Sequence, residues 1–132
     1  MKANDWIGLL HFKPTDFKYP ASLDVSIVRA LDHFVSLVGV KPQVISDYRQ
    51  GDPRQHGKGR AVDVVFNGLD PEVVVEKANT SGLFKGVGVY LNEVGGVSYH
   101  FDTRQDNIAD PSRPNMWGAF IKSVLDPVSG EA

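Results

Sequence analysis

Cysteine is absent from the sequence, and its absence excludes disulfide bonds and thiolate metal sites. A metal ion would have to be held by histidine, aspartate or glutamate side chains, with water completing its coordination. A charge excess of one sign is also lacking, because the formal net charge is −2 at pH 7 and like charges form no long run. This balance gives no reason to expect nucleic acid or an anionic membrane as a partner.

Long apolar runs are likewise missing. No stretch approaches the length of a transmembrane helix, and the short apolar segment near the N-terminus is interrupted by His11 and Lys13. A secretory signal peptide needs a longer apolar region followed by a small-residue cleavage site. We therefore expect a protein that is synthesised in the cytoplasm without a signal peptide.

What the chain does contain suits one domain over residues 1–132, because its length is near the commonest domain size and 42% of its residues are hydrophobic. Apolar spacing and turn residues predict, in chain order, a helix over 22–38, a short strand that runs into a loop within 42–49, a strand over 60–66, a helix over 70–82, a hairpin of strands 86–91 and 96–104, and a helix over 114–125. The first two helices are bounded by cap residues: Ser22 or Asp24 with Gly39, and Asp70 and Pro71 with Gly82. This order favours an α+β fold, with a mainly antiparallel sheet and flanking helices.

Three residues in or beside the predicted strands are candidate metal ligands: His56, Asp63 and His100. His56 lies in the loop RQHGKG before the strand AVDVVF, and Asp63 lies within that strand. Glycines in this loop let it fold back, so that both side chains can meet one ion, and His100 on the neighbouring hairpin would complete the site. Three nitrogen or oxygen ligands, with one position left for water, are the arrangement of hydrolytic zinc sites.

Each candidate ligand also has an ordinary structural role to consider. His56 would be a solvated group of a surface loop. Asp63 enters a buried strand, where a carboxylate needs a partner, and that partner would be an arginine: Arg49, Arg60 or Arg104. His100 would be a half-buried histidine with one nitrogen hydrogen-bonded.

Two motifs carry a resemblance to a known family. HGKGRAVD fits the pattern H-x-x-G-x-A-x-D, and YHFDTR fits an H-x-D element followed by an arginine. With SDYRQGDPRQ upstream and GVGVYL before the second histidine, the chain from about Phe12 to Trp117 resembles the zinc D-Ala-D-Ala carboxypeptidases and L-Ala-D-Glu endopeptidases. Members of that family cut peptidoglycan stem peptides and share their fold with the Hedgehog signalling domain. The resemblance implies that fold here.

The resemblance also implies that zinc is the cofactor and that its ligands are the three candidates above. It further implies that Arg49, in the segment DYR, holds a substrate carboxylate or the developing oxyanion. A guanidinium suits both tasks, since it donates two parallel hydrogen bonds. The alternative for Arg49 is an ion pair with Asp47 or Asp52.

The general base is expected to be a carboxylate that takes a proton from water and passes it to the leaving amine. Many relatives carry an acidic residue a few positions before the final histidine, but the segment VGGVS has none. We predict Asp102 in this role, because a residue two positions from His100 on one strand shares its face. Glu93, in the preceding turn, is the second candidate. Alternatively, Asp102 orients the ligand histidine.

Aromatic residues are candidates for a groove that binds the stem peptide: Tyr48, Tyr90, Tyr99 and Trp117. Tyr48 directly precedes Arg49, and we predict that both residues contact the substrate. In a small domain, aromatic side chains more often belong to the core, which is the alternative for all four.

The leading prediction for function is a monomeric zinc peptidase that hydrolyses an amide bond of the stem peptide at the cell wall, as a phage lysin does. The alternative is a zinc-containing, non-catalytic binding or structural module of the same fold. In a third hypothesis the three candidate ligands never meet, and the chain is a plain α+β domain. The choice between endopeptidase and carboxypeptidase specificity stays open at the level of the sequence.

Overall fold

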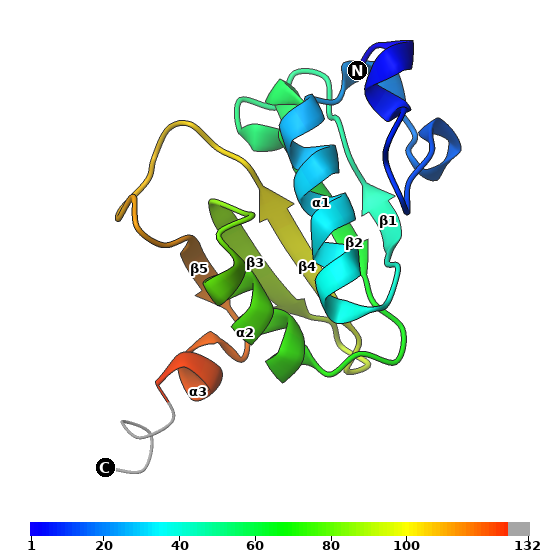
Figure 1. Cartoon of the computed structure of the whole chain (residues 1–132). Coiled ribbons are helices and arrows are strands. Elements are labelled where there is room, and N and C mark those ends of the chain that lie inside the picture. The colour runs from blue at the N-terminus through cyan, green and yellow to red at the C-terminus, as the bar shows by residue number, and fades with distance from the viewer. Residues whose placement is uncertain (127–132) are drawn as a thin grey trace.

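The computed structural model describes residues 1–126, which combine α-helices with one β-sheet (Figure 1). The helices of this part of the chain are α1 (Val25–Val38), α2 (Pro71–Ser81) and α3 (Ile121–Leu125). The strands are β1 (Gln43–Ser46), β2 (Ala61–Val65), β3 (Gly86–Leu91), β4 (Val97–Asp102) and β5 (Asn115–Gly118). Single turns of 3-10 helix occur at Ala3–Trp6, Pro14–Asp16, Pro20–Ser22 and Gln55–Lys58.

The two long helices begin and end where their cap residues predict. The carboxylate of Asp24 accepts a hydrogen bond of 2.9 Å from the backbone N–H of Ser26, and α1 follows directly. At the other end Gly39 has a φ of 75°, and its N–H donates to the carbonyl of Val35. The second helix, α2, is bounded in the same way by Asp70, Pro71 and Gly82.

The five strands form one sheet in the order β1-β2-β4-β3-β5. The β1–β2, β2–β4 and β4–β3 pairs are antiparallel, and β3–β5 is parallel. The predicted α+β class with a mainly antiparallel sheet is thereby confirmed. Both α1 and α2 lie on one face of the sheet, while β1 and β5 form its two edges (Figure 1).

The predicted helix over 114–125 is wrong in its first half. Residues Asn115–Gly118 instead pair with the outer edge of β3, with Gly86 opposite Asn115. The edge of β3 offers unpaired backbone groups, and satisfying them outweighs the weak local preference for helix. Left-handed backbone at Gly118 (φ 102°) and Phe120 (φ 66°) then separates β5 from the short α3. The short strand predicted within residues 42–49 is confirmed as β1, and the predicted loop follows after Ser46.

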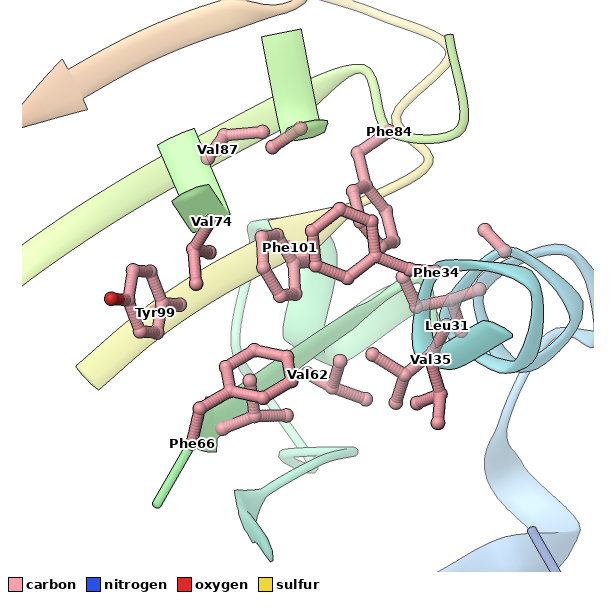
Figure 2. Close-up of a cluster of buried hydrophobic side chains, with 14 of the residues drawn as sticks. Leu31, Phe34, Val35, Val62, Phe66, Val74, Phe84, Val87, Tyr99 and Phe101 are labelled. Atoms are coloured by element: carbon pink, nitrogen blue, oxygen red, sulfur yellow. The ribbon is translucent and has the colours of Figure 1, made fainter. Parts of the chain in front are cut away.

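The core fills the space between the sheet and the two long helices, as Figure 2 shows. Phe34 of α1 packs against Phe66, Phe84 and Phe101, with ring centroids 5.3 to 6.1 Å apart. Phe84 and Phe101 stack at 4.2 Å. Because strand side chains alternate between faces, the neighbours of these core residues point to the opposite face of the sheet.

Candidate metal centre

A row of residues crosses the sheet on the face opposite the helices. Asp63 of β2 lies beside His100 of β4, His100 beside Gly88 of β3, and Gly88 beside Trp117 of β5. Each member of the row alternates along its strand with core residues, so the row points away from the core. The pairing of β2 with β4 thus brings two of the three candidate ligands together.

The loop before β2 brings in the third ligand, His56. The backbone N–H of Arg49 donates to the carbonyl of His56 at 3.1 Å, which closes the loop. Gly57 leaves no room for a side chain, since a Cβ there would collide with the carbonyl of Asp52. Gly59 has a φ of 69° and ends the 3-10 turn. The two glycines therefore permit the reversal that the sequence predicted.

The hydrogen-bond partners of His56 and His100 show which ring nitrogen donates a proton and which one faces Asp63. His56 donates through Nδ1 to the carbonyl oxygen of Asp47 at 2.7 Å, and its Nε2 lies 3.3 Å from Asp63 Oδ1. His100 donates through Nε2 to Asp102 Oδ2 at 2.7 Å, and its Nδ1 lies 3.3 Å from the same Asp63 oxygen. The three ligand atoms all lie within 4.8 Å of one another. This group could hold a metal ion, and the hypothesis in which the three residues never meet is wrong.

Asp102 lies behind His100 and is fully buried, with 0% of its surface exposed. Arg104 donates to both of its carboxylate oxygens, at 2.9 Å from Nε and 2.7 Å from Nη2. Burial opposes ionisation of Asp102, but the hydrogen bonds from Arg104 and His100 outweigh it and lower its pKa to about 2. The structure therefore places Asp102 where a carboxylate orients a ligand histidine.

Contacts within the cluster shift the pKa values of Asp63 and His100. Burial opposes ionisation of Asp63, but its hydrogen bonds with His100 and His56 outweigh burial and hold its pKa well below the usual range. Burial likewise disfavours the charged form of His100, but its contacts with Asp102 and Asp63 raise its pKa. A bound cation among these atoms would stabilise the same charge on Asp63.

Arg49 contacts the cluster from the solvent side. Its Nη2 donates to Asp63 Oδ2 at 2.9 Å, its Nε donates to Ser46 Oγ at 3.1 Å, and its Nη1 lies 3.7 Å from Asp52 Oδ2. An ion pair with Asp52 was one of the alternatives that the sequence left open. The contact with Asp63 places Arg49 directly beside a candidate ligand.

An open cleft of about 400 Å³ exposes the cluster. Two of the aromatic candidates, Tyr90 and Trp117, line it, and Trp117 Nε1 donates to the Tyr90 hydroxyl at 2.8 Å. Tyr48 lines a neighbouring cleft instead. Tyr99 is 2% exposed and belongs to the core.

The carboxylates predicted as general bases do not line this cleft. Glu93 is exposed in the turn between β3 and β4, and Asp102 is buried behind His100. The cleft is lined instead by Asp63 and Asp52. The sequence offered Asp52 only as a partner for Arg49, because the loop that brings it to the cleft is a tertiary feature.

Comparison of the chain with protein-family models, with curated proteins and with solved structures finds no match. The family resemblance is therefore carried by the motifs HGKGRAVD and YHFDTR and their neighbours. A helix long and apolar enough to cross a membrane does not occur among residues 1–126.

Proposed function

We propose that this protein is a zinc-dependent peptidase that hydrolyses an amide bond of the peptidoglycan stem peptide, with the fold of the family it resembles. The observation that carries the proposal is the convergence of His56, Asp63 and His100 at the floor of an open cleft. In this proposal the protein acts as a monomer at the cell wall, in the manner of a phage lysin.

The donor set fits zinc. His56 Nε2, Asp63 Oδ1 and His100 Nδ1 would hold the ion, and two nitrogens with one oxygen are ligands found in catalytic zinc sites. Zinc, when bound, supplies a Lewis acid that makes water a nucleophile near neutral pH. The carbonyl of Asp47 and the carboxylate of Asp102 keep both rings in the required orientation.

Arg49 would hold the substrate. Its Nη1 lies 3.7 Å from Asp52, too far for a hydrogen bond, so this nitrogen can donate to a substrate carboxylate or to the developing oxyanion. The indole of Trp117 lies against His100, with ring centroids 5.4 Å apart, and forms a flat wall beside the reacting amide. These contacts would orient a peptide across the cleft.

Asp52 is the carboxylate that we propose as general base. Its Oδ1 accepts a hydrogen bond of 2.7 Å from the backbone N–H of Arg54, which fixes the side chain, while Oδ2 is left for the proton. It would take that proton from the attacking water and deliver it to the leaving amine. The earlier candidate Glu93 is tested beside it.

The experiment is digestion of purified peptidoglycan, with mass analysis of the fragments and quantification of new amino and carboxyl termini. We expect cleavage that stops with a chelator, returns with zinc, and is abolished in His56→Ala. Asp52→Asn should retain zinc and lose cleavage, whereas Glu93→Gln should keep both. Cleavage that survives complete removal of metal would rule out the proposal.

The non-catalytic module remains the second candidate, because the two carboxylates predicted as bases lie outside the cleft. Such a module would bind about one zinc ion per chain and release no new termini from any peptidoglycan preparation. Zinc retention without cleavage by the wild-type protein would establish it in place of the peptidase.

A further inference from the structure

A second cleft lies beside the candidate metal centre. It measures about 670 Å³ and is lined by residues of β1 and of the N-terminal segment. Strand β1 forms one edge of the sheet (Figure 1). Arg49 lines both this cleft, which we call the β1 cleft, and the cleft of the metal centre. A substrate held at the metal centre can therefore extend past Arg49 into the β1 cleft.

Two tyrosines form an aromatic corner in the β1 cleft. The rings of Tyr19 and Tyr48 meet nearly at right angles, at 78°, with centroids 6.1 Å apart. Tyr19 is 46% exposed, and the ammonium of Lys18 lies 5.5 Å from its ring centroid. Exposed aromatic faces in a cleft offer flat apolar surface to a ligand that is apolar on one side and polar on its rim.

A buried hydrogen-bond acceptor, the carboxylate of Asp47, lies among the residues around the two tyrosines. Asp47 is 4% exposed, and its Oδ2 accepts hydrogen bonds from the backbone N–H groups of Lys18 (2.7 Å) and Tyr19 (3.4 Å). Its Oδ1 has no hydrogen-bond partner among residues 1–126. Leaving a buried carboxylate oxygen unpaired destabilises the folded state. Asp47 is also one of the residues that line the β1 cleft.

The backbone beside the cleft is poorly suited to an added peptide strand. The register of β1 against β2 shifts between Val44 and Ser46, which leaves Ile45 out of the pairing, and β1 has only 4 residues. A bulged, short edge strand gives few aligned backbone groups for β-strand addition. The cleft instead offers side-chain donors and acceptors around an aromatic corner, among them Ser22 and Gln50.

We infer that the β1 cleft is a subsite for an N-acetylated amino sugar of the glycan strand. A sugar ring would stack on Tyr19 and Tyr48, and its acetamido N–H or a hydroxyl would donate to Asp47 Oδ1. The inference rests on the proposed function and deepens it. In peptidoglycan the stem peptide is joined to such a sugar through its L-alanine, so a sugar held beside Arg49 places the bonds nearest the glycan at the metal centre.

The test compares two probes: a synthetic stem peptide joined to N-acetylmuramic acid, and the same peptide without the sugar. Binding is measured by NMR titration of the metal-free protein, which cannot hydrolyse either probe, and kcat and KM are measured with the zinc-loaded protein. We expect the wild type to bind the sugar-bearing probe roughly tenfold more tightly, since one aromatic stack and one charged hydrogen bond are added. In the kinetic assay the preference should appear in KM.

Matched variants test whether the preference for the sugar-bearing probe arises in the β1 cleft. The affinity ratio is the affinity for the sugar-bearing probe divided by the affinity for the peptide alone. Tyr19→Ala should reduce this ratio to near one, and Asp47→Asn should lower it. Tyr19→Phe should retain most of the preference for the sugar-bearing probe. Phe120→Ala removes an exposed aromatic side chain near β5, at the opposite edge of the sheet, and should leave the ratio unchanged.

Different results of this experiment would contradict the sugar subsite and the proposed peptidase. A wild type that binds both probes equally, or that binds neither, overturns the sugar subsite, as does a preference that survives in Tyr19→Ala. Cleavage of both probes at equal rates would support the peptidase and contradict the sugar subsite. Tighter binding of the sugar-bearing probe by a protein that cleaves neither probe would support the sugar subsite and contradict the peptidase.

Discussion

Asp102 illustrates how a residue can lie beside its predicted neighbour and still face away from the cleft. Its position two residues after His100 puts both side chains on one face, and they do contact each other. That contact uses the His100 nitrogen that faces away from Asp63, so Asp102 fixes the ring and does not face the cleft. A carboxylate held by Arg104 and fully buried is suited to orienting a ligand.

At this scale we predict that Asp102→Asn weakens zinc binding roughly 10- to 100-fold. The amide lacks the charge that holds the His100 Nε2–H and the Arg104 guanidinium. Zinc affinity is measured by competition with a chromogenic chelator, with Asp110→Asn, in an exposed turn, as the control. An affinity equal to that of the wild type would show that Asp102 does not orient His100.

At the scale of elements, two glycines of β3 make room for the site. A Cβ at Gly86 would lie 2.6 Å from Asp102 Cγ, and one at Gly88 would lie 2.6 Å from Trp117 Nε1. Any side chain at either position would displace these groups from the face of the sheet. The segment GVGVYL thus combines core valines on one face with bare backbone on the other.

We predict that Gly86→Ala lowers the free energy of unfolding by about 1–3 kcal/mol, because the added methyl overpacks against a buried, hydrogen-bonded carboxylate. The zinc affinity should fall with it, since Asp102 must move. Gly96→Ala is the control, because a Cβ there meets only the side chain of Asn92, which is exposed. Urea unfolding with and without zinc measures both effects, and equal losses in the two variants would contradict the prediction.

At the scale of the whole molecule, the three residues that could hold a metal ion come from three separate segments of the chain. His56 comes from a loop, Asp63 from β2 and His100 from β4, and residues 1–126 assemble these segments around one core. A metal bound by all three should therefore stabilise the entire domain, and not just one segment.

We predict that zinc at a concentration a hundred times its Kd raises the free energy of unfolding by about 2.7 kcal/mol. This corresponds to a rise in Tm of roughly 10 °C for a domain of this size. Differential scanning calorimetry of the metal-free and zinc-loaded protein measures the shift. His56→Ala should lose most of it, and an undiminished shift in that variant would mean that zinc binds elsewhere.

Local patterns in the sequence were sufficient for α1, α2 and the strands β1 to β4, and they singled out the three residues that could hold a metal ion. The caps at Asp24 and Asp70 and the glycines that follow each helix act within one turn, so α1 and α2 could be predicted from neighbouring residues alone. The pairing of β2 with β4 then sets Asp63 and His100 side by side on the face away from the core.

Tertiary structure decided what depends on segments far apart in the chain. Residues 115–118 became a strand because the edge of β3 was open, and Asp52 reached the cleft because the loop closes between Arg49 and His56. The β1 cleft exists because Asp47 ties the N-terminal segment to β1. Such contacts depend on which distant groups meet after folding, and local propensity carries no information about them.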